Sequence, residues 1–262
     1  ASQRPQGSAV VRESASGASK GSCFAPQRRP SRSEASRSEA SLSTSLSTSL
    51  STSLASSLST PASPDPALLV LFSLPLVQFD VPLQKLTAVA PIEFEKERVL
   101  LQRSLRETGQ LVRANFEVAT ADNLRSLLTR GRFGVVHFSG HGAPDALAFE
   151  DGCGKAHVVR VELLQRLMSA GAGTARVRLV FCNCCHAGHA AHRFVAAGIP
   201  HVVCCPTVLA DQAAAIFPRA FYMALAMGQS VADAFAIGVE SVRAAPDMPD
   251  ADLEANKFQL LP

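Results

Sequence analysis

The sequence predicts an α/β fold with a mostly parallel central sheet and helices on both faces. Four hydrophobic runs have the length and continuity of strands buried on both faces, at residues 67–77, 133–142, 176–185 and 201–206. Segments with helical periodicity separate these runs, and such alternation of strand and helix is typical of parallel sheets. Ligands bind such sheets beyond the carboxyl ends of the strands, so we expect the functional residues there.

Composition divides the chain into two parts. Residues 1–64 are rich in Ser, Ala, Thr, Pro and Arg and contain repeats of SRSEA and SLST. Such a segment buries too little apolar surface to offset the entropy of an ordered backbone, so we expect a disordered, low-complexity tail. Residues 65–262 are long enough to bury a sizeable core and are expected to form one domain.

The predicted elements follow in order along this domain. A helix is expected at residues 92–107, because Phe94, Val99 and Leu105 fall near one helical face and Gly109 follows its end. A hairpin is expected at residues 147–159, with its turn at Asp151 and Gly152. The remaining predictions are short strands at 115–120 and 257–262, and helices at 122–131, 161–171, 190–197, 210–226 and 230–244.

Charge and cysteine usage limit the possible partners and compartments. The tail holds seven Lys and Arg against three acids, which leaves 18 bases and 19 acids in the domain, so nucleic acid is not an expected partner. No stretch reaches the roughly 18 apolar residues of a membrane span, so no membrane association is expected. An odd total of seven cysteines, with two adjacent pairs, argues against a disulfide framework. We therefore expect an intracellular, cytoplasmic protein, with organelle targeting by the tail as an open alternative.

Two reactive side chains stand just beyond predicted strands. His141 follows the run VVHFSG and Cys185 ends the run LVFCNCC, so both are expected at one edge of the sheet. A thiolate is a strong nucleophile, and a nearby imidazole can accept the thiol proton and later protonate a leaving amine. The N–H groups of Gly142 and Cys185 are candidate oxyanion donors.

Other residues nearby have simpler interpretations. His137 lies inside its strand and is expected to be a core histidine, Cys182 is expected to act as a small hydrophobe, and Cys184 is expected to point away from Cys185. The segment CNCCHAGHAAH has a zinc site as its alternative interpretation. Its candidate ligands all lie at one strand–helix junction, whereas structural zinc sites usually use two separated pairs of ligands. We therefore expect no metal and no cofactor.

The same residues resemble a known family. VVHFSGHG, followed about forty residues later by LVFCNCCHAG, is similar to the caspase-related peptidases of the CHAT group. The resemblance continues through residues 194–238, which carry an Ala-Gly turn, a strand, an Asp before a helix, and a Gly-x-Ser helix start. It implies a caspase-like three-layer sandwich, a catalytic dyad of His141 and Cys185, and Gly142 with Cys185 as oxyanion donors. Its substrates would be proteins or peptides.

Three further positions are candidates for the substrate pocket. Asn183 stands where metacaspases usually carry an acid that selects basic residues, so that preference does not carry over. His186 replaces the acidic or polar residue that often follows the nucleophile. Asp211 is expected first as a helix N-cap and alternatively as a pocket residue. The alternative function is a catalytically inactive CHAT module that binds partner proteins in signalling scaffolds.

Overall fold

A six-stranded sheet is the centre of the part of the chain that the structure, a computed structural model, describes: residues 67–130, 133–170 and 176–262. The tail expected at residues 1–64 lies outside these described residues. Five neighbouring strands are parallel, and the strand at one edge is antiparallel, as expected for a mostly parallel sheet. The strand order is β4 (Arg113–Val118), β1 (Ala67–Phe72), β5 (Val135–Ser139), β9 (Leu179–Asn183), β10 (His201–Cys204) and β11 (Gln259–Leu261).

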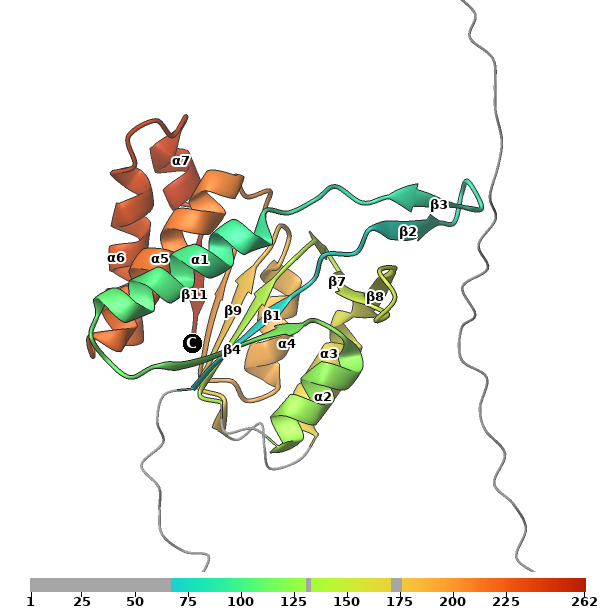
Figure 1. Ribbon diagram of the computed structural model, residues 1–262, viewed down its shortest axis with the longest axis horizontal. Helices are drawn as coiled ribbons and strands as arrows, with labels where there is room; N and C mark the ends of the chain where they lie inside the picture. The colour runs from blue at the N-terminus through green and yellow to red at the C-terminus, as the bar shows by residue number, and fades with distance from the viewer. Residues whose placement is uncertain (1–66, 131–132, 171–175) are drawn as a thin grey trace, which may run out of the picture. The chain divides into compact units, whose positions relative to one another are not determined.

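Helices cover both faces of this sheet, which confirms the predicted three-layer arrangement (Figure 1). One face carries α2 (Ala121–Arg130), α3 (Val161–Ser169) and α4 (Gly188–Ala196). The other face carries α1 (Phe94–Glu107), α5 (Asp211–Ala226), α6 (Val231–Arg243) and α7 (Ala251–Ala255). The short helix α7 is an element that the sequence analysis did not predict.

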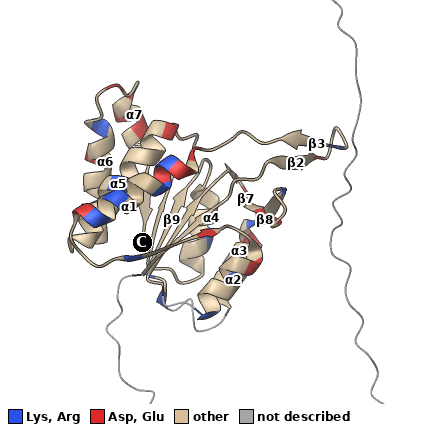
Figure 2. Ribbon diagram, in the orientation of Figure 1, with Lys and Arg blue, Asp and Glu red and all other residues tan. Residues whose placement is uncertain are grey.

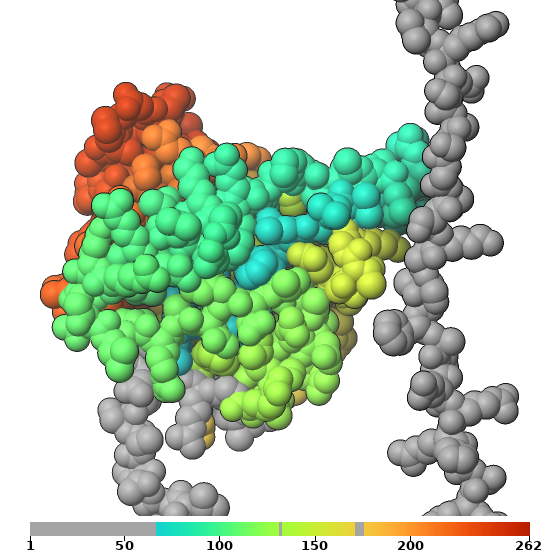
Figure 3. Space-filling view, viewed as in Figure 1, coloured from blue at the N-terminus to red at the C-terminus, as the bar shows by residue number. Residues whose placement is uncertain are grey.

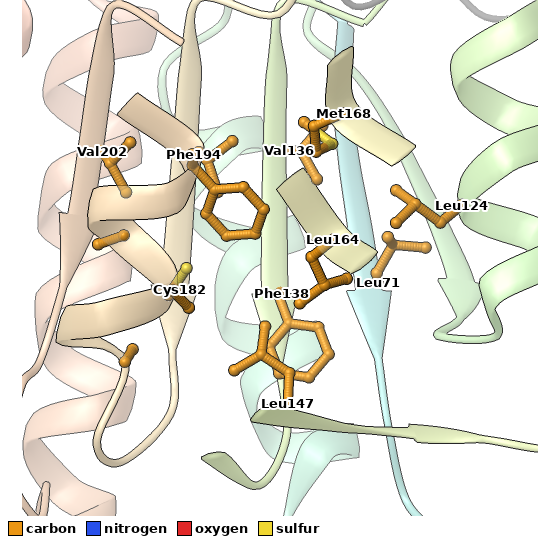
Figure 4. Packing of buried hydrophobic residues seen from close by; sticks show 14 of the residues in the cluster. Leu71, Leu124, Val136, Phe138, Leu147, Leu164, Met168, Cys182, Phe194 and Val202 are labelled. Atoms are coloured by element: carbon orange, nitrogen blue, oxygen red, sulfur yellow. The ribbon is translucent and has the colours of Figure 1, made fainter. Parts of the chain in front are cut away.

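Each face of the sheet has its own hydrophobic cluster, because successive strand residues point to opposite faces. In β1, Leu69 and Leu71 join the cluster under α2 to α4, whereas Leu68 and Val70 join the cluster under α1 and α5. Figure 4 shows the first cluster, in which Leu71 and other strand residues meet side chains from the covering helices. All four of these β1 side chains are at most 3% exposed, as expected for a strand buried on both faces.

Two hairpins stand outside the main sheet. The first, β2 (Val77–Asp80) and β3 (Lys85–Ala88), was not predicted, because the apolar run at residues 67–77 reads as one strand. The run instead leaves the sheet after Phe72. The second is the predicted hairpin, formed by β7 (Ala146–Glu150) and β8 (Ala156–Arg160), and the short β6 (Gly142–Ala143) pairs with β7. The two hairpins lie side by side (Figure 3), joined by a bridge from Val77 to Lys155.

Helix α1 buries only part of its predicted apolar face. Val99 was expected inside but is 49% exposed, so that expectation was wrong. Its place on the buried face is taken by Glu97 and Ser104, which are 7% and 0% exposed. The predicted burial of Phe94 and Leu105 is confirmed, but the buried face of α1 is partly polar, which apolar periodicity alone did not indicate.

Acidic and basic side chains both lie on the exposed surface of α1 (Figure 2). They form pairs three or four residues apart, such as Lys96 with Glu93 at 3.2 Å and Arg103 with Glu107 at 2.7 Å. Exposed pairs of this kind stabilise a helix by only about 0.3–0.5 kcal/mol each. Within the described ranges, no helix combines the length and apolar character needed to cross a bilayer.

A serine cap defines the start of α6. The Ser230 Oγ accepts a hydrogen bond from the Asp233 N–H at 3.1 Å. We expect Ser230→Ala to lower the free energy of unfolding by about 1 kcal/mol, because this N–H then loses its partner. Urea denaturation measures the change. Ser241→Ala is the control within the same helix, since the Ser241 hydroxyl only donates to the Ile237 carbonyl, and an equal loss there would contradict the capping role.

Candidate active site

His141 and Cys185 come from neighbouring strands and line one cavity, as the sequence predicts. His141 follows β5 directly before β6, and Cys185 lies two residues beyond the end of β9. The cavity has a volume of about 690 Å³. Its remaining lining comes mainly from α1 and its preceding loop, and from the start of α5. The two candidate residues therefore line the same cavity at the carboxyl edge of the sheet, where parallel sheets place their functional groups.

Gly142 packs directly against the backbone of Cys185. A Cβ atom built on Gly142 would lie 2.0 Å from the Cys185 carbonyl oxygen and 3.0 Å from the Cys184 sulfur. Because the first of these contacts is to backbone, a side chain at residue 142 has no room. Glycine is thus required for close approach here, and the φ of Gly142 is not in the left-handed region. This contact brings the histidine loop and the cysteine loop together.

A backbone carbonyl orients the imidazole of His141. The His141 Nε2 lies 2.9 Å from the carbonyl oxygen of Ala90, in the loop before α1. A carbonyl oxygen only accepts hydrogen bonds, so Nε2 carries the proton that it donates. In the neutral ring the lone pair is then on Nδ1, which is left as the basic nitrogen. The loop ahead of α1 therefore sets the tautomer of the candidate base.

Cys185 stands at a sharp turn between β9 and α4. The next residue, His186, has a φ of 55°, a left-handed conformation that is uncommon for residues other than glycine. The His186 N–H donates to the Thr207 carbonyl at 3.0 Å, which holds this turn in place. The Cys185 sulfur accepts a hydrogen bond from the Leu209 N–H at 3.4 Å.

The neighbouring thiols are held in their protonated form. Burial raises the pKa of Cys182 and of Cys184 well above the ordinary value, and the pKa of Cys204 to about 12. Burial also raises the pKa of Cys205. Cys185 is half-buried and packs on the α1 and α5 face, whereas Cys184 packs in the cluster of the opposite face, as expected. Of these five thiols, Cys185 is the one with solvent access for chemistry.

A mostly buried polar network, which includes Glu97, Ser139 and Asn183, forms part of the cavity wall. The Glu97 carboxylate accepts hydrogen bonds from His137 Nε2 at 3.0 Å, Ser139 Oγ at 2.5 Å and Asn183 Nδ2 at 2.8 Å. His137 is 0% exposed, so the prediction of a core histidine is confirmed, and its Nδ1 lies 2.9 Å from the Tyr222 hydroxyl. Burial opposes ionisation of Glu97, but these hydrogen bonds and the His137 ring outweigh it, so the pKa of Glu97 lies below its ordinary value.

The three candidate pocket residues have different positions. Asn183 and Asp211 line the cavity, whereas the cavity lining, within the described residues, does not include His186. Asp211 was expected as an N-cap, and this was wrong, because the cap of α5 is Ala210 and Asp211 is the first helical residue. Its carboxylate still lies in the first turn, where the helix dipole favours negative charge.

The described residues contain no cluster of side chains that matches the alternative zinc site. No group of three or more His, Cys, Asp or Glu side chains there is arranged to hold a metal ion. One of the candidate ligands, His189, bonds instead to Asp145 on the loop after β6, at 2.8 Å.

Sequence reasoning missed two contributors to this site. Ala90 contributes only a carbonyl oxygen, which no sequence pattern reveals. The sequence did contain a signal for Glu97, because it lies three residues after Phe94 and four before Leu101, which places it on the buried face of α1. An acid among apolar positions at helical spacing indicates a buried, partnered carboxylate.

Comparison with protein families places the chain in one of them. The model of the CHAT domain matches residues 23–247, which is most of the chain. The chain belongs to the CHAT domain family. The match begins inside the segment expected to be the tail. No curated protein matches the sequence of this CHAT domain chain.

Two solved proteases are similar in fold to this CHAT domain chain. The first is the Arg-specific cysteine proteinase gingipain R, with a TM-score of 0.46 and 11% identity over 75% of this chain. This chain spans only 45% of the gingipain chain. The second is caspase-1 from Spodoptera frugiperda, with a TM-score of 0.48 and 10% identity, covering 76% of this chain and 86% of that protein. Arginine specificity is a property of the gingipain.

Proposed function

We propose that this chain is a cysteine endopeptidase that cleaves protein substrates with a dyad of His141 and Cys185. Membership of the CHAT family supports this class of function. The observation that carries the proposal is the packing of Gly142 against the Cys185 carbonyl, with His141 and Cys185 on the wall of one cavity. A protein that only binds partners has no need of a thiol and an oriented imidazole at this place.

The proposed reaction assigns a role to each group. The Cys185 sulfur attacks the peptide carbonyl carbon, and His141 Nδ1 takes the thiol proton. The carbonyl oxygen becomes negatively charged and is bound by the N–H groups of Gly142 and Cys185. His141 then protonates the leaving amine, and the carbon–nitrogen bond breaks to leave a thioester on Cys185. Water hydrolyses the thioester and restores the free thiol.

The cavity lining supports a pocket for one substrate side chain. Asn183 is 5% exposed and donates through Nδ2 to both Glu97 and the Ala214 carbonyl. Its Oδ1 is buried and has no hydrogen-bond partner among the described residues. Because an unpaired buried acceptor is costly, a donor group on the substrate fits here. Asp211 adds a carboxylate at the rim, whereas His186 is not proposed to contact the substrate.

Selective alkylation tests whether Cys185 is activated. In a Cys23→Ser, Cys153→Ser background, which removes the exposed Cys153 and the tail cysteine, we expect iodoacetamide at pH 7 to label Cys185 first. The rate should exceed that of the other four thiols by about 10-fold or more, because burial keeps those thiols protonated. Peptide mapping by mass spectrometry measures each site.

Selective labelling alone could reflect exposure, so His141→Ala is the second arm of this test. Loss of the base should slow the labelling of Cys185 and move its pH profile toward that of a free thiol, near pKa 8.5. Equal labelling of Cys182, Cys184 and Cys185, or an unchanged rate in His141→Ala, would contradict the dyad.

A further inference from the structure

The buried carboxylate of Glu97 contacts the ends of both strands that carry the dyad. Ser139 and Asn183 are register partners in the parallel pair of β5 and β9. Each lies two residues before a dyad member, Ser139 before His141 and Asn183 before Cys185. Ser139 donates to the Glu97 Oε2 at 2.5 Å, and Asn183 donates to the Glu97 Oε1 at 2.8 Å. One side chain on α1 thus holds the two strand ends together.

The rest of the network fixes the position of this carboxylate. His137, two residues before Ser139 on β5, donates to the Glu97 Oε1 at 3.0 Å. Its imidazole stacks on Phe181, with ring centroids 4.9 Å apart, and contacts Tyr222 of α5. The Asn183 Nδ2 also donates to the Ala214 carbonyl of α5 at 3.0 Å. Helices α1 and α5 are therefore both bonded to the strand ends.

A buried carboxylate is a poor way to gain stability. Its desolvation is costly, and apolar groups of similar volume often serve a core equally well. Buried ionic groups are retained in some proteins because they specify one arrangement of the surrounding elements. In this chain Glu97 joins α1 to the paired ends of β5 and β9 at the wall of the cavity.

We infer that Glu97 is a positioning residue, which bonds the ends of β5 and β9 so that His141 and Cys185 face each other. This inference rests on the proposed function. Glu97 acts through Ser139 and Asn183 and has no chemical step of its own. Loss of its carboxylate releases Ser139 and Asn183 from α1, so the loops that follow these paired strand ends can shift. A displacement of about 1 Å between reacting groups costs about 100-fold in rate.

The test compares two Glu97 variants with a control in the same network. Glu97→Ala removes all three acceptor contacts. Glu97→Gln keeps the shape and one acceptor oxygen but loses the charge. It is the variant to measure if Glu97→Ala does not fold. Tyr222→Phe is the control, because it removes only the His137 Nδ1 contact at the far end of the network. All variants are made in the Cys23→Ser, Cys153→Ser background.

The measured quantity is the rate of iodoacetamide labelling at Cys185 as a function of pH, together with the melting temperature. We expect both Glu97→Ala and Glu97→Gln to label more slowly at pH 7, the alanine variant by up to about 30-fold and the glutamine variant by less, with profiles shifted toward a free thiol. Tyr222→Phe should melt at a lower temperature and keep the wild-type pH profile. On a cleaved peptide, the Glu97 variants should lose kcat, with KM changed by less than about threefold.

The outcomes separate the two proposals. A wild-type protein whose Cys185 labels like a free thiol overturns the dyad and the positioning role with it. A wild-type protein with activated Cys185 and folded Glu97 variants with the same pH profile overturns the positioning role alone. An equal change in Tyr222→Phe also overturns it, because general loosening then explains the loss. An increase in KM with unchanged labelling would instead make Glu97 a substrate contact.

Discussion

Replacement of either dyad residue is expected to abolish peptide cleavage. Cys185→Ala removes the nucleophile and His141→Ala removes the base, and in enzymes with such paired groups each single loss costs at least about 10⁴-fold in kcat. The two losses should not add in the double variant, because the groups act as one unit. Turnover of a peptide library by the wild-type protein and each variant measures the effect and also reveals the cleavage preference.

Two matched controls keep this result specific. Cys182→Ala replaces a thiol on the same strand that packs in the opposite cluster, and His189→Ala replaces an exposed histidine bonded to Asp145. Both should retain cleavage within a few-fold. Turnover that survives in Cys185→Ala would contradict the proposed nucleophile. A wild-type protein with no turnover on any peptide would favour the alternative of an inactive binding module.

The second large effect is expected from one methyl group at Gly142. In Gly142→Ala the new Cβ would lie 2.0 Å from the Cys185 carbonyl oxygen, so the two loops must separate. We expect cleavage to fall by at least about 100-fold, because the separation displaces His141 and the Gly142 N–H from the reacting atoms. The kinetics of the purified variant measure the loss, and circular dichroism shows whether the fold remains.

Gly134→Ala is the control for the same chemical change. A Cβ at Gly134, just before β5, meets no atom within 4 Å, and the φ of Gly134 is not in the left-handed region. This variant should keep its activity. Full activity in Gly142→Ala would show that the close approach of the two loops is not needed for catalysis.

Much of the fold could be predicted from the hydrophobic pattern of the sequence. Leu68 to Leu71 are buried on both faces of the sheet, and such continuous apolar strands are typical of parallel sheets under two helix layers. The unpredicted β2–β3 hairpin has a physical reason as well. An apolar run shows that a segment is strand-like, but the point at which it leaves the sheet depends on its neighbours. The Leu76 N–H pairs with the Gly154 carbonyl of the second hairpin, a contact that local sequence does not encode.

For the candidate site, the sequence by itself determined which residues we propose to carry the chemistry and at which edge of the sheet they lie. Side-chain type and position after a strand are local properties, so His141, Gly142 and Cys185 could be selected without coordinates. Only the tertiary structure decided which groups orient and surround them: the Ala90 carbonyl, the Glu97 carboxylate and the cavity between α1 and α5. These contacts join residues that are 40 or more positions apart, and a hydrogen bond between distant residues exists only once the chain has folded.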